Sequence, residues 1–113
     1  MAFAEETLGL DLVLRALADG SRRRILEVMR GTPRRVGEVA GLVGVSQQAV
    51  SRHLKILREA GLVQEERRGT RHLFTVRTDG FQVAREFLDA FWPDRLARLK
   101  TAAEASLKER HDG

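Results

Sequence analysis

The stretch from residue 36 to residue 61 constrains the fold more than any other part of this 113-residue chain. It begins with apolar residues at the i, i+3, i+4, i+7 spacing of a short helix, namely Val36, Val39, Ala40 and Val43. Gly44 ends that helix, and one residue later Ser46 can cap the next by accepting hydrogen bonds from first-turn amides. Gly61 then ends the second helix. Two helices joined by a tight glycine turn predict a helix-turn-helix.

The second helix of this pair, predicted from Ser46 to Ala60, has two distinct faces. Its inward stripe consists of Val50, Leu54 and Leu57. Its outward face consists of Gln47, Gln48, Ser51, Arg52 and Lys55. Glutamine pairs well with adenine edges, arginine and lysine with guanine edges, and serine with bases or phosphates. The N-terminal residues of such a helix enter the DNA groove first, so we expect Gln47, Gln48, Ser51 and Arg52 to read bases. Any amphipathic helix also needs a polar face, so this face alone does not establish DNA binding.

The rest of the chain predicts a helical protein with one hairpin. A helix is expected over Thr7–Ala18, and a second, capped by Asp19 or Ser21, stops at Gly31. After the helix-turn-helix come strands over Leu62–Glu66 and His72–Arg77, joined by a turn over Arg67–Thr70. A last helical region starts at Phe81 and is split by Pro93 after Trp92. The fold class is therefore mainly α with a small β-hairpin, in the order α-α-α-α-β-β-α, as a single domain over residues 1–113.

The basic charge of the chain is concentrated in its middle. Residues 1–19 carry a net charge of −3, residues 20–80 a net charge of +7, and residues 81–113 no net charge. A basic centre between acidic and neutral ends is typical of a polyanion-binding region flanked by structural segments. A solvated surface would give the same composition, so the charge supports nucleic-acid binding without deciding it.

Two arginine groups deserve separate interpretations. The predicted hairpin tip around Gly69 carries four polar residues, namely Arg67, Arg68, Thr70 and Arg71. They could follow a phosphate backbone or enter a minor groove. The alternative is that they form a solubilising turn. Residues 22–24 are three arginines at a helix start, where they oppose the helix dipole. A bound anion would explain them, and a solvated face would do so equally well.

The segment "ALADGSRRRILEVM…VGEVAGLVGVSQQAVSRHLKILREAGLV" resembles the winged helix-turn-helix repressors of the ArsR type, and "FLDAFWPDRLARLK" extends the resemblance toward the C-terminus. The resemblance implies a helix-turn-helix over about 36–60, a wing over about 62–77, and a homodimer formed by about 5–18 and 81–109. It implies repression from a palindromic operator, and it adds His53 to the DNA-binding candidates, as a residue that braces the helix or touches DNA. The dimer interface would include Leu10, Leu14, Phe87, Phe91, Trp92, Leu96 and Leu99.

Several other functions find little support in the sequence. The chain has no cysteine, which excludes disulfides and the cysteine metal site of many ArsR proteins. The chain therefore resembles the branch without that site. We expect no cofactor and no enzyme activity, because no nucleophile–base pair or phosphate loop stands out. No apolar run reaches transmembrane length, so we expect a cytoplasmic protein. The alternatives are a winged-helix protein-interaction module and a metal-responsive repressor with Asp, Glu and His ligands. His72 and His111 look incidental, and the sequence identifies no effector.

Overall fold

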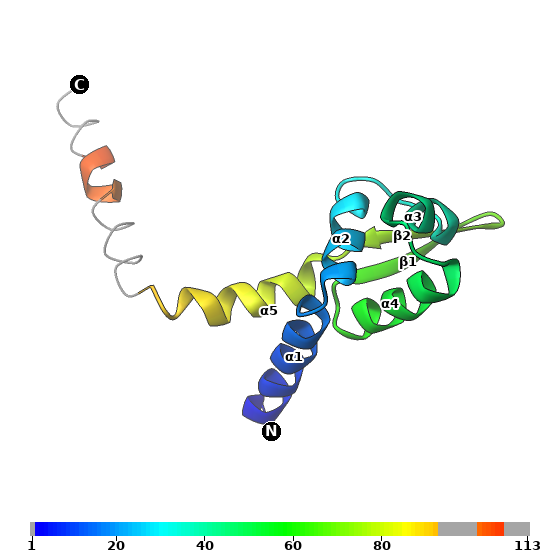
Figure 1. The fold of residues 1–113 in the computed structure, drawn as a ribbon. Coiled ribbons are helices and arrows are strands. Elements are labelled where there is room, and N and C mark those ends of the chain that lie inside the picture. The colour runs from blue at the N-terminus through cyan, green and yellow to red at the C-terminus, as the bar shows by residue number, and fades with distance from the viewer. Residues whose placement is uncertain (1, 93–101, 108–113) are drawn as a thin grey trace.

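The computed structural model describes residues 2–92 and 102–107, except for the side chains of residues 2–8. Its elements are α1 (Ala2–Leu17), α2 (Gly20–Met29), α3 (Val36–Val43), α4 (Gln47–Glu59), β1 (Val63–Arg68), β2 (Arg71–Val76) and α5 (Thr78–Asp89). Residues 102–107 are also helical. This order confirms the predicted α-α-α-α-β-β-α arrangement. Helices α2, α3 and α4 gather around the hairpin, while α1 and α5 run out of this cluster on the side away from the hairpin tip (Figure 1).

The core lies where α2, α3 and α4 meet the start of the hairpin. Its largest fully buried side chains are Ile25, Met29, Leu54, Leu57, Leu62, Val13, Val39, Val50 and Val63. The predicted inward stripe of α4 is therefore confirmed, because all three of its members are buried. Each such side chain contributes roughly 1.5–3 kcal/mol when it leaves water, and together they fix the orientation of α4.

The turn between α3 and α4 has the geometry that its residue types require. Gly44 adopts the left-handed conformation at φ 77°, and its amide donates to the Ala40 carbonyl at 2.9 Å. Ala40 itself is buried. The Ser46 hydroxyl accepts from the Ala49 amide at 3.1 Å, which confirms the predicted cap. A residue with a Cβ at position 44 would strain this turn.

The wing is an antiparallel hairpin whose register runs from Val63 opposite Val76 to Arg68 opposite Arg71. The prediction of a four-residue turn over Arg67–Thr70 was wrong, because the strands continue to Arg68 and resume at Arg71. Gly69 occupies the first position of the two-residue connection between the strands. Its positive φ of 64° gives the backbone twist that a two-residue hairpin turn needs.

A further strand pairing precedes α3. Arg34 forms an isolated antiparallel bridge with Phe74, through backbone bonds of 3.0 and 2.8 Å. A single bridging residue has no periodicity, so sequence patterns did not indicate it.

Helices α1 and α5 differ from prediction at their ends. The first helix begins at Ala2, five residues before the predicted start, and the last begins at Thr78, three residues before Phe81. Helix α5 ends at Asp89 rather than after Trp92, and the Phe91 and Trp92 amides close tighter turns on the carbonyls three residues back. Pro93 keeps the helix from resuming through Trp92, because a proline disfavours helical geometry in the residue before it.

Candidate nucleic-acid interface

The outward face of α4 is exposed and free to bind a ligand. Gln48, Ser51, Arg52 and Lys55 are all exposed, and none of them forms a hydrogen bond or ion pair with another residue that the structure describes. Because these side chains lie opposite the buried stripe of α4, the core fixes the direction in which they project. The structure thus brings together four of the predicted contact residues on one rigid helix.

Three other predicted residues of this helix have partners within the protein. The Ser46 hydroxyl holds the helix cap. Gln47 lies against α3, where its Nε2 stands 3.4 Å from the place a Cβ on Gly37 would occupy. His53 is half-buried, and its Nδ1 stands 3.5 Å from Arg22 Nη1 on α2. Ser46 is thus held within α4 itself and His53 lies against α2, while Gln47 is exposed with its side chain beside α3.

The predicted DNA-binding residues of the wing differ in whether their side chains are paired with another residue. Arg68 donates to Glu66 on its own strand at 3.0 Å, which offsets part of its charge. Thr70 and Arg71 are exposed and have no side-chain partner within the described ranges 9–92 and 102–107. Arg67 is exposed too, and its charge helps to lower the pKa of Glu65. The hairpin tip therefore presents two exposed guanidinium groups and one hydroxyl.

A polar network joins the base of the wing to the end of α4. Glu65 on β1 accepts from His72 on β2, at 2.6 Å from Nδ1 to Oε1, and from Arg58 on α4 at 3.3 Å. The hydrogen bond from His72 is the main cause that holds the pKa of Glu65 below its ordinary value. The view that His72 is incidental was wrong, because its partner lies on the neighbouring strand.

A shallow hollow of about 320 Å³ separates the start of α3 from the wing. Its lining includes Arg35 on one side and Thr70 and Arg71 on the other. Arg35 was missed by sequence reasoning because it precedes a helix and belongs to no periodic face. The only sequence signal for it is its place in the basic middle of the chain.

The three arginines at the start of α2 have a role that neither sequence interpretation foresaw. Arg22 donates to the Ala16 and Arg15 carbonyls at 2.8 and 2.9 Å, and Arg23 donates to the Leu17 carbonyl at 2.7 Å. These carbonyls end α1, where the helix dipole is negative and helix carbonyls lack their usual i+4 amide partners. Arg24 is exposed. Two of the three arginines therefore cap α1 rather than face an external anion.

The described residues contain neither a cluster of metal ligands nor a membrane-spanning helix. Within residues 2–92 and 102–107, no group of three or more His, Cys, Asp or Glu side chains could hold a metal ion. No helix in that part of the chain is long and apolar enough to cross a membrane.

Comparison with known proteins assigns the family. Residues 13–65 match the family described as "bacterial regulatory protein, arsR family". The chain is 44% identical over 82 residues to the HTH-type transcriptional regulator Rv2034 of Mycobacterium tuberculosis, a match that covers 73% of this chain and 77% of that protein. The chain belongs to the ArsR family.

Two further ArsR-type comparisons cover most of the fold. The chain is 30% identical over 70 residues to the transcriptional repressor SdpR of Bacillus subtilis, with 62% of this chain and 78% of that protein covered. Its structure is similar to the homodimeric winged helix-turn-helix DNA-binding domain Mb0332 of Mycobacterium bovis. There the TM-score is 0.60 at 29% identity, and the match covers 96% of this chain and 87% of that chain. The ArsR resemblance inferred from the sequence is thus confirmed, together with the winged helix-turn-helix fold.

Proposed function

We propose that this ArsR-family protein is a DNA-binding transcriptional repressor that acts as a homodimer on a palindromic operator. The observation that carries the proposal is the outward face of α4, where Gln48, Ser51, Arg52 and Lys55 project from a helix held by the core and have no partner in the described structure. Side chains that are polar, free and rigidly placed suit base edges in a major groove, which is wide enough to admit an α-helix. Such a protein works where the DNA is, so we place it in the cytoplasm.

The roles within this surface follow from position and charge. Gln48, Ser51 and Arg52 lie toward the start of α4 and are assigned to base edges, while Lys55, one turn later, is assigned to phosphate. Arg71 and the other free groups of the wing tip would attract the DNA backbone beside the groove. The partly neutralised Arg68 contributes less than its sequence position suggests.

The homodimer is supported by apolar side chains left exposed on α1, on α5 and at residues 91–92 just after α5. Leu14 and Phe87 are each 41% exposed, Phe91 is 66% and Trp92 is 55%. The rings of Phe87 and Phe91 pack edge to face, with their centroids 5.1 Å apart. Apolar residues concentrated on two adjacent helices are typical of an interaction surface, and a second copy of the chain would bury them. Leu10 is half-buried, and the predicted interface residues Leu96 and Leu99 lie outside the described residues.

The test is the affinity of the purified protein for a duplex selected from genomic DNA by binding and footprinting. We expect one dimer per palindrome, with half-sites centred about 34–36 Å apart. If six to ten phosphates are neutralised, affinity should fall by roughly 10³- to 10⁵-fold between 50 and 200 mM salt. A scrambled duplex of the same length is the control. Weak, salt-insensitive binding that does not distinguish the two duplexes would favour a protein-interaction module instead.

A further inference from the structure

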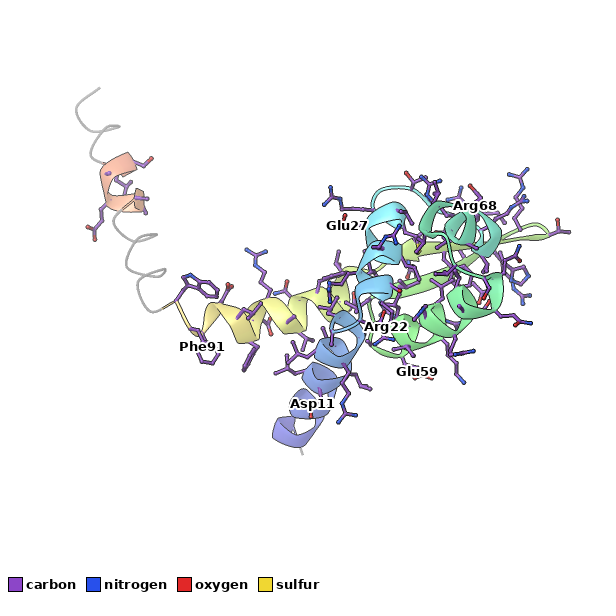
Figure 2. The ribbon with its side chains drawn as sticks, in the orientation of Figure 1. Asp11, Arg22, Glu27, Glu59, Arg68 and Phe91 are labelled. Atoms are coloured by element: carbon purple, nitrogen blue, oxygen red, sulfur yellow. The ribbon has the colours of Figure 1, made fainter. Side chains whose placement is uncertain are left out.

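Arg22 contacts three helices through one half-buried guanidinium group. Its side chain is 14% exposed and lies at the junction of α1, α2 and α4 (Figure 2). Nε and Nη2 donate to the carbonyls of Ala16 and Arg15, which end α1. Nη1 faces His53 Nδ1 on α4 at 3.5 Å and lies 3.8 Å from the carboxylate of Asp19. Arg22 and Arg23 both donate to carbonyls at the end of α1. The side chain of Arg23 donates to the Leu17 carbonyl of that helix, whereas Arg22 also contacts α4.

A hydrogen bond across this 3.5 Å contact requires one particular form of His53. A guanidinium has five donors and no acceptor, so the bond forms only when Nδ1 of His53 is the acceptor and the ring proton is on Nε2. A proton on Nδ1 would set two donors against each other. The ring of His53 is thereby tied to the end of α1, one residue after Arg52 on the outward face of α4.

We propose that Arg22 is a positioning residue for DNA recognition: through His53 it fixes the orientation of α4 relative to α1. This inference rests on the proposed function, in which α1 takes part in the dimer interface and α4 binds a half-site. In a two-fold dimer, the angle between α1 and α4 sets the separation of the two α4 helices. Arg22 therefore sets how strictly the protein selects the distance between half-sites, without touching DNA.

The first experiment measures affinity for three operators, with the native half-site spacing and with one base pair added or removed. Arg22→Met keeps the apolar stem and removes every donor, while His53→Phe removes only the acceptor on α4 and leaves the bonds to α1. We expect each variant to reduce the preference for native spacing by roughly threefold or more, in line with coupling energies between contacting residues. In the double variant, the preference for native spacing should fall no further than in the more affected single variant. Arg23→Met, which loses only the bond to the end of α1, should keep the wild-type preference.

A second experiment needs no DNA. Nitrogen NMR of the histidine rings reports which nitrogen carries the proton, and we expect the Nε2–H form of His53 in the wild type and a mixture of both forms in Arg22→Met. Sedimentation and circular dichroism establish that each variant is a folded dimer; His53→Phe carries the test if Arg22→Met does not fold.

The outcomes separate this inference from the proposed function. A wild-type protein that binds no duplex would refute the proposed function itself. The role of Arg22 alone would be overturned if the wild type binds its operator but each variant weakens binding to all three operators equally. It would also be overturned if the variants change binding to none of them. An Nδ1–H tautomer of His53 in the wild type would also overturn it.

Discussion

Gly80→Ala tests how α5 is seated on the rest of the domain. A Cβ at this position would stand 2.5 Å from the Ala60 carbonyl oxygen, 2.9 Å from Leu62 Cδ2 and 3.0 Å from the Gly61 carbonyl carbon. Two of these atoms belong to the backbone and cannot rotate away. The Gly80 amide also donates to the Gly61 carbonyl at 2.9 Å, so a shift of α5 would weaken that bond too.

The cost can be estimated from these contacts. Overpacking a tight site costs about 1–3 kcal/mol, and the backbone clash places this site at the upper end. The strained hydrogen bond adds about 1 kcal/mol. Alanine recovers up to about 1 kcal/mol through its better helix propensity. We therefore expect Gly80→Ala to lower the free energy of unfolding by about 2–3 kcal/mol, a loss that shifts Tm by roughly 8–12 °C for a domain of this size.

The assay is urea unfolding followed by circular dichroism at one fixed protomer concentration, because a dimer makes stability depend on concentration. Gly41→Ala is the matched control: Gly41 is an exposed helical glycine of α3 with nothing within 4 Å of the added Cβ. That substitution should stabilise the protein by about 0.5–1 kcal/mol. If Gly80→Ala is as stable as the wild type, the close packing of α5 on the α4–β1 turn is refuted.

Four further substitutions test the cap, the wing base and the wing tip. Ser46→Ala removes the cap of α4 and should cost about 1 kcal/mol of stability in the same urea assay; an unchanged midpoint would contradict the capping role. The bond from His72 lowers the pKa of Glu65 below 4.5, so its contribution to stability is present above pH 4.5 and is lost as the pH falls through the lowered pKa. Glu65→Gln should therefore destabilise the protein at pH 7 and make its acid unfolding profile shallower, whereas an identical profile would exclude this pair. Arg71→Ala should reduce the salt dependence of DNA binding by about one phosphate contact, and Arg68→Ala by less, because Arg68 is paired; equal losses in a salt titration would contradict this difference.

The elements that the sequence predicted well are those encoded by neighbouring residues. Gly44, Ser46 and Gly61 each act within a few positions of themselves, through a left-handed turn or a cap, and all three were placed correctly. The buried stripe of α4 also follows from local periodicity. The free polar face opposite the stripe was predicted for the same reason.

The features that sequence reasoning missed depend on partners far along the chain. Arg22 meets His53 across 31 positions, and Gly80 is required by the backbone of Ala60, twenty positions earlier. Nothing in the residues next to either position signals these contacts. The arginines at the start of α2 therefore looked like an anion site or a solvated face, although their partners are the carbonyl groups that end α1.

A base-substitution scan with Arg52→Ala tests most directly whether the outward face of α4 reads bases. The affinities of the wild type and the variant are measured for the operator and for duplexes that each carry one changed base pair. We expect the variant to bind the operator more weakly by about 1–3 kcal/mol and to lose discrimination at one or two neighbouring base pairs only. Equal weakening on every duplex, or unchanged discrimination at every position, would contradict base reading by Arg52.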